Sequence, residues 1–418
     1  MEVIFGVIIG LLVMTALVTA HEFGHFIAAK RNGVKVNEFG IGFPPRGIAW
    51  LHIKTKETKK NGKPKWKWER LPKKDWDKEH KTLVFSLNLL PIGGFCAMDG
   101  ESDADTKKGT FGAASYWSKT KILFAGVTAN WLVAWVVFTI LALVGMPKAF
   151  NGQFFIDSDV RVEGSPVQVA EVLDDTPAKA AGIEAKDLLK SACVLEKDIC
   201  KNGTKVDIFD TYNVMEFNDA HRGELVRYVI ERDGKDQDVD LTLGTDGYAL
   251  GISMQDTSTA KYYTTWSAPI IGATTTIQLT GETYRGIWNM LVGLVKGVAN
   301  QFSAEESVRE AGKAEIGKAG DSVTGPIGII GVIFPNIVAG GPIYVMFIAA
   351  IISLSLACMN VLPIPALDGG RWLLITIWRL RGKKLDKDTE AKIVSRAFIV
   401  LIALMILITI LDITKIIR

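Results

Sequence analysis

The fold is decided by the stretch VIFGVIIGLLVMTALVTAHEFGH, residues 3–25, in which a long apolar run leads directly into His21-Glu22-Phe23-Gly24-His25. A membrane-spanning helix needs roughly 20 mainly apolar residues, so we expect a first transmembrane helix over about residues 3–29. Ionisable side chains at membrane depth are costly and are usually functional. The two histidines and the glutamate are therefore the first candidate site.

Three further apolar segments approach the same length, and we expect transmembrane helices over residues 122–146, 343–362 and about 393–413. Apolar residues make up 48% of the 418 residues, which is typical of membrane spans combined with water-exposed parts. The predicted fold class is a multi-span α-helical membrane protein with four transmembrane helices. The lipid bilayer is an expected partner, and a net charge of +3 gives no reason to expect nucleic acid.

Lysine and arginine are unevenly distributed between the loops. Residues 30–121 and the short loop after the third span are basic, whereas the long region 147–342 is acidic overall. Because basic loops favour the cytoplasmic side of a membrane, we expect the HEFGH end of the first helix to face the cytoplasm. The long region is then extracytoplasmic, and the protein is a multi-pass protein of the cell's inner (plasma) membrane.

Two histidines four residues apart lie on one face of a helix, where both can bind one zinc ion, with Glu22 as general base for a zinc-bound water. Catalytic zinc sites usually have a third protein ligand. Asp368 follows the third span in the segment NVLPIPALDGG, residues 360–370, and the predicted topology places it on the same side of the membrane. We therefore predict that His21, His25 and Asp368 bind Zn²⁺ and that Glu22 is catalytic.

Pro363 and Pro365 interrupt the helix before Asp368, and the glycine pair at 369 and 370 allows close approach of the backbone. Irregular backbone at membrane depth is tolerated only where it is buried in protein or lines a wet cavity. The segment is therefore expected to contribute to an internal site.

HEFGH on a first span, with NxxPxPxLDGG on a later one, resembles the site-2 protease family of intramembrane zinc metalloproteases, and in particular its bacterial branch, the regulators of sigma-E proteases. The similar segments extend over essentially the whole chain; they are GIGFPP (40–45), LPIGGFCAMDGE (90–101), AGVTAN (125–130) and GPIG (325–328). Val127 stands where the family usually has proline, and Cys96-Ala97 where it has Val-Lys.

The resemblance implies regulated intramembrane proteolysis of single-span membrane proteins, such as anti-sigma factor-like proteins or remnant signal peptides. It implies that Asn360 holds the substrate backbone or the oxyanion, and that residues 30–121 include a membrane-associated β-hairpin whose edge pairs with an unwound substrate. The remaining expected substrate-binding residues are Gly93, Gly94, Phe95, Pro363 and Pro365.

The pattern changes over residues 160–255, between the two halves of the membrane core, 1–146 and 342–418. Residues 167–172 alternate like a strand, and Asp175–Ile183 has the proline and glycine of a short helix. This region resembles a PDZ domain, although Ala185 stands where glycine is usual, and a plain small β domain is the alternative. Its Cys193 and Cys200 are either a disulfide or two free thiols.

Residues 256–341 are expected to form amphipathic connecting helices at the membrane surface. Weaker apolar stretches near Ile270 and Ile327 are interrupted by Gly, Thr or Pro and are interpreted as interfacial or re-entrant pieces.

Two other functions are alternatives to intramembrane proteolysis. A membrane-anchored zinc protease for soluble peptides needs a third ligand in the same domain as HEFGH, where only His52 and His80 are available. A non-proteolytic scaffold that binds partners through its PDZ-like domain predicts a damaged metal motif, and this motif is intact.

Overall fold

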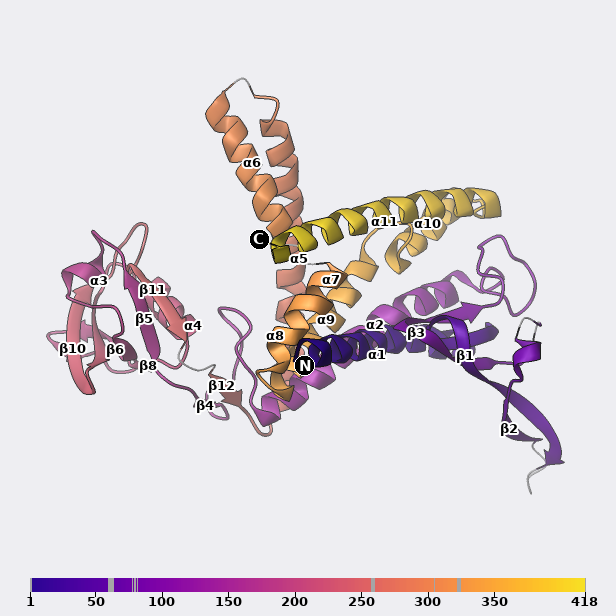
Figure 1. The fold of residues 1–418 in the computed structure, drawn as a ribbon, viewed down its shortest axis with the longest axis horizontal. Coiled ribbons are helices and arrows are strands. Elements are labelled where there is room, and N and C mark those ends of the chain that lie inside the picture. The colour runs from indigo at the N-terminus through magenta and orange to yellow at the C-terminus, as the bar shows by residue number, and fades with distance from the viewer. Residues whose placement is uncertain are drawn as a thin grey trace. The chain divides into compact units, whose positions relative to one another are not determined.

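The computed structural model describes residues 2–58, 64–76, 78, 80, 82–256, 260–303, 305–321 and 325–417, and Figure 1 shows its fold. Residues 59–63, which belong to the basic region 30–121, lie outside the described residues. Four described helices are long and apolar enough to cross a membrane, as the sequence predicts. They are α1 (Glu2–Arg31), α2 (Tyr116–Val144), α9 (Pro342–Val361) and α11 (Lys387–Ile417).

The helices extend beyond the apolar segments from which they were predicted. The helix of the second span begins at Tyr116 rather than at residue 122, and α11 begins at Lys387 rather than near residue 393. Hydropathy marks only the part of a helix that suits hydrocarbon, whereas backbone hydrogen bonding continues into polar turns.

The chain divides into two compact units. We call Met1–Val137 with Thr276–Arg418 the membrane unit, and Phe138–Thr275 the inserted unit. Each is described by itself.

The membrane unit contains an antiparallel sheet in the order β2-β1-β3, formed by β1 (Val36–Thr58), β2 (Pro64–Arg70) and β3 (Val84–Met98), with a short helix η1 (Lys73–Asp75) after β2. Both β1 and β3 fold back on themselves, so that Gly40 pairs with Ser86 on one side and with Phe95 on the other. The second half of β3 therefore forms an outer strand of the sheet, and β3 packs along α1.

The turn of β3 lies at the depth of the middle of α1. The Thr15 hydroxyl donates a hydrogen bond of 2.5 Å to the backbone oxygen of Pro91, and Leu89, Leu90 and Ile92 on this turn are exposed. Thr15 precedes His21 by six residues, or about 9 Å along a helix. The exposed apolar turn thus lies beside the apolar part of the first span, as a membrane-associated hairpin requires.

An aromatic cluster attaches the sheet to the end of α1. The ring of Phe26 lies 5.4 Å from that of Phe39 and 5.7 Å from that of Phe85. Such pairs contribute about 0.5–1.5 kcal/mol beyond their buried area, so they hold β1 and β3 against the turn of α1 that follows the HEFGH motif.

The remaining elements before α9 are helical. Figure 1 shows α5 (Ala268–Asn300) and α6 (Glu306–Asp321) as a helical hairpin. The segment from α7 (Pro326–Gly328) through η2 (Ile329–Ile333) to α8 (Phe334–Val338) packs against the first half of α1. Gly6 permits this approach, because a Cβ there would lie 2.4 Å from the Cα of Pro335.

The two weaker apolar stretches of the connecting region are both helical. The stretch near Ile327 leads into a short apolar helix, Ile329–Val338, and its re-entrant placement stays a prediction. The stretch near Ile270 is not a separate piece, because it is the beginning of the continuous helix α5. The glycines and threonines of this segment lower helix propensity by small amounts, and helical hydrogen bonding continues through them.

The inserted unit is built around an antiparallel sheet in the order β10-β9-β6-β5-β11, with two short strands paired to β6. Its apolar core includes Val169, Leu189, Tyr228 and Ile230, all fully buried. The elements are β4 (Arg161–Glu163), β5 (Val167–Val172), α3 (Pro177–Ala180), β6 (Leu188–Glu196), β7 (Ile199–Cys200), β8 (Val206–Asp207), α4 (Thr211–Ala220), β9 (Leu225–Arg232), β10 (Lys235–Thr242), β11 (Ile252–Asp256) and β12 (Lys261–Tyr263).

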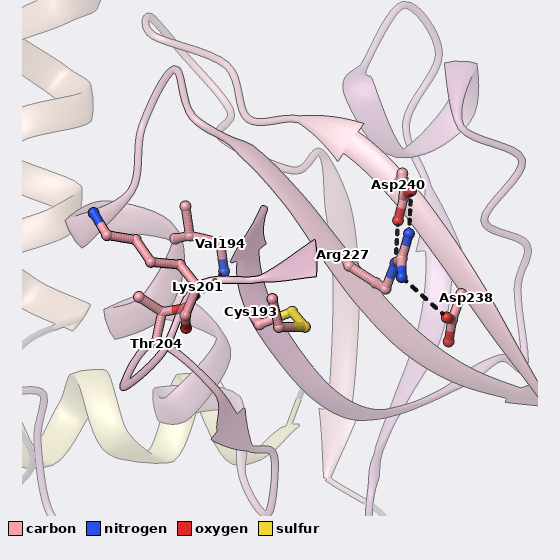
Figure 2. Close-up of a disulfide and its surroundings, with 8 residues drawn as sticks. Cys193, Val194, Lys201, Thr204, Arg227, Asp238 and Asp240 are labelled. Carbon is pink, nitrogen blue, oxygen red and sulfur yellow. Dashed lines mark hydrogen bonds and ion pairs between the residues drawn. A yellow bond between two sulfur atoms is a disulfide. The ribbon is translucent and has the colours of Figure 1, made fainter. Parts of the chain in front are cut away.

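Cys193 and Cys200 form a disulfide that closes the β6–β7 hairpin (Figure 2). The sequence had left this pairing open. On the same sheet, Arg227 of β9 donates to Asp240 of β10 at 2.6 and 2.7 Å and lies 3.5 Å from Asp238 (Figure 2). The hydrogen bonds that Arg227 donates to Asp240 raise the pKa of Arg227 further above its usual range, so this pair is charged at every physiological pH.

Candidate metal centre

Three side chains that can bind a metal converge at the end of the first span. His21 Nε2 lies 3.1 Å from Asp368 Oδ2 and 3.1 Å from His25 Nε2, and the last two atoms lie 3.3 Å apart. Among the described residues, this is the group of histidine, cysteine and acidic side chains that could hold a metal ion. His21 and His25 are one turn apart on α1, whereas Asp368 comes from α10 (Asp368–Leu380).

The distances fit a zinc ion. Zinc binds histidine nitrogen and carboxylate oxygen at about 2.0–2.1 Å in tetrahedral geometry, so two of its ligand atoms lie about 3.3 Å apart. The three observed separations of 3.1–3.3 Å agree with this value. Two imidazoles and one carboxylate are also a donor set typical of catalytic zinc.

The backbone of α2 orients one of the imidazoles. His25 Nδ1 donates a 2.8 Å hydrogen bond to the backbone oxygen of Ile122, which leaves the Nε2 lone pair free to face the metal. Histidine ligands usually have such a second hydrogen bond, because it fixes the tautomer and the orientation of the ring.

A glycine on α2 makes room for both histidines. A Cβ at Gly126 would lie 2.5 Å from His25 Nε2 and 2.6 Å from His21 Nε2, closer than real contacts allow. Gly24 on α1 serves the same approach, since its Cβ would lie 2.3 Å from the backbone oxygen of Ala125. The two helices therefore meet closely at the metal centre, and Gly126 was quoted from the sequence only as part of the AGVTAN motif.

Asp368 is the first residue of α10, after the break that follows α9. The glycine pair behind it is in close contact with that break: a Cβ at Gly369 would lie 2.1 Å from Val361 O, and one at Gly370 would lie 2.0 Å from Ile364 O. Burial acts to raise the pKa of Asp368, but hydrogen bonds with His21 and His25 hold that pKa below its usual range. The side chain is therefore a carboxylate, as a metal ligand must be.

A pocket of about 270 Å³ opens onto the three ligand atoms. Glu22, which is half-buried, lines this pocket beside them. Asn360 also lines it, and its amide nitrogen donates to Leu356 O at 3.0 Å. The arrangement combines a metal centre, a carboxylate and a side-chain amide around one cavity.

The other residues predicted to bind substrate lie near the pocket rather than in its lining. Gly93 and Gly94 are buried against α1 at Val18 and Thr19. Phe95 is half-buried next to Gly40. Pro363 and Pro365 belong to the break between α9 and α10. The pocket is instead lined on the β3 side by Cys96 and Met98.

Sequence reasoning missed several residues that line the pocket, namely Cys96, Met98, Glu101, Leu123, Ala366, Leu367 and Arg371. Alternation along β3 was the available signal, because side chains two residues apart share a face and Cys96, Met98 follow Gly94 at that spacing. Burial raises the pKa of the Cys96 thiol to about 12, so it stays protonated at neutral pH.

These features are typical of one class of protein, the membrane-embedded metal-dependent hydrolases. Comparison with known proteins narrows the class. Residues 9–59 and 65–405 match the model of peptidase family M50. The chain is 25% identical to the zinc metalloprotease RasP of Geobacillus kaustophilus over 99% of both chains. It is 28% identical to a protein of Clostridium acetobutylicum over 98% of this chain and 97% of that one.

A third relative, the zinc metalloprotease RasP of Oceanobacillus iheyensis, is 23% identical over 97% of this chain and 98% of its own. The chain belongs to peptidase family M50, the site-2 proteases, and is a zinc metalloprotease. The family resemblance, the enzyme class and the zinc cofactor that the sequence predicted are thereby confirmed.

Proposed function

We propose that the protein is an intramembrane zinc endopeptidase in which His21, His25 and Asp368 hold the zinc ion and Glu22 is the general base. The observation that carries this proposal is the meeting of three ligand atoms, 3.1–3.3 Å apart, beside Glu22 in one pocket. These groups lie where a long apolar helix ends, so the peptide bond that reaches them belongs to a membrane protein.

Zinc, when bound, polarises the carbonyl of the scissile peptide bond and makes water more acidic. Glu22 takes a proton from the attacking water and delivers it to the leaving amine. Asn360, near the end of α9, also lines the pocket. Its amide nitrogen donates to Leu356 O, and its amide oxygen can accept a hydrogen bond from the substrate backbone. This gives Asn360 a positioning function on the bound chain.

The substrate is a single-span membrane protein that unwinds at the cleavage site. A helical peptide bond is shielded, and an extended segment can add to a sheet edge through main-chain hydrogen bonds. The outer strand formed by Gly94–Met98 pairs with β1 on one side and leads to Cys96 and Met98 in the pocket lining. Gly93, Gly94 and Phe95 shape this edge. Pro363 and Pro365 keep the segment between α9 and Asp368 out of the helix.

The metal centre belongs on the cytoplasmic side of the inner membrane and the inserted unit outside. The basic loops support this orientation. The Cys193–Cys200 disulfide supports it independently, because disulfides persist in oxidising compartments. We assign residues 160–255 to an extracytoplasmic PDZ-like domain that limits the size of substrates, and α5 with α6 to the membrane surface, where Trp288 and Phe302 are exposed.

A non-proteolytic scaffold that binds partners through its PDZ-like domain does not account for the meeting of His21, His25 and Asp368 beside Glu22 in one pocket. A protease for soluble peptides is disfavoured for a different reason. Its third ligand would come from the loop beside HEFGH, whereas the side chain that meets His21 and His25 is that of Asp368, 347 residues away from His21.

The test is cleavage of a single-span membrane fusion protein by the purified full chain in proteoliposomes. Glu22→Gln should retain zinc and lose activity by at least about a thousandfold, since general-base catalysis and water activation are both lost. Glu282→Gln, which changes an exposed carboxylate on α5, should behave as wild type. Bound zinc with cleavage independent of Glu22 would contradict the proposed mechanism.

The orientation is tested separately with protease-accessible tags in right-side-out cells. A tag in the β9–β10 turn at Gly234 should be cut from outside, and a tag in the β1–β2 hairpin should be protected. The reverse pattern would overturn the proposed placement of the inserted unit without affecting the metal centre.

A further inference from the structure

A second cluster of charged side chains lies beside the metal centre and has no part in the reaction described above. It combines two acids and two bases, Asp103, Lys119, Arg371 and Glu390, with side chains 7–21% exposed. Burying charge is expensive unless every group is paired and hydrogen-bonded. We therefore consider the partners of each of these four side chains.

Glu390 is the centre of one half of this cluster. It lies in the first turn of α11, but its carboxylate accepts hydrogen bonds from the segment after β3. Its Oε2 accepts hydrogen bonds from the Ser102 hydroxyl at 2.9 Å and from the Asp103 backbone N–H at 3.0 Å. Its Oε1 lies 3.5 Å from Arg371 Nε.

Asp103 is the centre of the other half. Its carboxylate accepts from the Lys119 ammonium of α2 and, at 3.2 Å, from the backbone N–H of Leu385. Lys119 is close in sequence to Ile122, whose carbonyl orients His25. The cluster thus connects the segment after β3 with α2 and with the start of α11.

Arg371 connects the cluster to the metal centre. It follows Asp368 by three residues on α10, so the two side chains are neighbours on one helix face. It lines the pocket together with Glu101, to whose backbone oxygen it donates a hydrogen bond. Glu390 and the Glu101 carbonyl therefore hold a guanidinium that stands next to a proposed zinc ligand.

We propose that Glu390 is a positioning residue of the metal centre, which keeps Arg371 away from Asp368 and fixes the pocket wall at residues 101–103. The proposal rests on the assignment of Asp368 as a zinc ligand. A guanidinium pairs strongly with carboxylates. Once the carboxylate of Glu390 is removed, Arg371 turns towards Asp368 and competes with zinc for it.

The experiment measures zinc retention, as metal content of the purified full chain after equilibration with increasing chelator, in detergent. The variants are Glu390→Gln, Arg371→Gln and the double variant, with Asp388→Asn as the matched control. Asp388 is an exposed acid in the same helical turn. Thermal unfolding and the kcat and KM for the membrane fusion substrate are measured on the same samples.

Glu390→Gln should lose zinc at about tenfold lower chelator concentration, the usual effect of removing a group that orients metal ligands. Its kcat should fall with KM little changed, because the substrate edge of β3 is untouched. Removing Arg371 as well should restore zinc retention towards wild type, since the competing cation is gone. Asp388→Asn should match wild type.

Two results would overturn the proposal: wild-type zinc retention in Glu390→Gln, or a loss that the Arg371→Gln change does not reverse. The second result would indicate a purely structural ion pair, with unfolding temperature and zinc content falling together. Failure of the proposed function would give a different result. The wild type would then bind no zinc, or would cleave the substrate as well as Glu22→Gln does, whichever residue occupies position 390.

Discussion

The membrane unit and the inserted unit use charged side chains in opposite ways. In the membrane unit, Asp103, Lys119 and Glu390 are buried, and each of the two carboxylates accepts from more than one group. In the inserted unit, pairs such as Lys190–Asp236 and Arg227–Asp240 lie on the exposed surface of a sheet whose core is apolar.

The difference follows from what each unit has to position. An apolar core alone can hold a β sheet together, so its surface charges can be changed at small cost. A metal centre between helices requires polar groups at fixed places in a medium that does not solvate them, and each must then be paired. Substitutions at charged or closely packed positions should therefore have larger effects in the membrane unit than in the inserted unit.

The largest effect is expected from Gly126→Ala. The added methyl group would lie 2.5–2.6 Å from the two histidine rings, so both proposed zinc ligands must move. Zinc content should fall below a tenth of wild type, and cleavage by at least about a hundredfold, because a ligand displaced by 1 Å no longer fits the metal. Gly281→Ala is the control, since a Cβ there meets nothing within 4 Å.

The next effect is expected from Asp103→Ala, which leaves the buried Lys119 ammonium unpaired. Removing one partner of a buried ion pair costs about 3–5 kcal/mol, so the unfolding temperature in detergent should drop clearly. Asp240→Ala removes one partner of an exposed pair in the inserted unit, and its shift should be far smaller. Equal shifts in unfolding temperature for the two variants would contradict the expected difference between the membrane unit and the inserted unit.

A smaller effect is expected from reducing the Cys193–Cys200 disulfide. The bridge closes a loop with a sequence separation of 7, for which loss of chain entropy in the unfolded state gives about 2–3 kcal/mol. With reductant, the inserted unit should unfold at a lower temperature, as measured by the temperature at which its sheet becomes sensitive to protease. The metal centre should keep its zinc, because Cys96 and Cys358 remain free thiols throughout.

The smallest effect is expected for the pH dependence of stability that Asp159 contributes. Partial desolvation acts to raise its pKa, but hydrogen bonds from Ser267 and Thr265 hold that pKa below its usual value of 3.8. A depressed pKa contributes stability that is complete above the unfolded value and is lost as pH falls below it. Acidification from about pH 6 to about pH 3 should therefore destabilise the start of α5 in wild type more than in Asp159→Asn. Hydrogen exchange of the backbone at Ser267 would show this, and an equal response in both proteins would contradict it.

Much of the proposed site was accessible from the sequence because its parts follow one-dimensional rules. Apolar length predicted the four spans, and helical periodicity placed His21 and His25 on one face. The charge of the loops brought Asp368 to the same side of the membrane. The structure adds the distances of 3.1–3.3 Å between ligand atoms, which no pattern supplies.

The residues that were missed depend on packing between segments distant in the chain. Gly126 matters because two helices approach closely there, and Arg371 matters because Glu390 and Glu101 meet it from other elements. Helix bounds also differed, since hydropathy measures preference for hydrocarbon and not hydrogen bonding.

By itself, then, the sequence determined the class of enzyme and the four spans, because zinc ligation and membrane length constrain residue type and spacing directly. It also predicted the residues proposed to bind zinc and the base beside them. Only the tertiary structure decided that Cys193 pairs with Cys200, which half of β3 leads into the pocket, and which buried charges surround the metal centre. These depend on distances between segments that the order of residues along the chain does not specify.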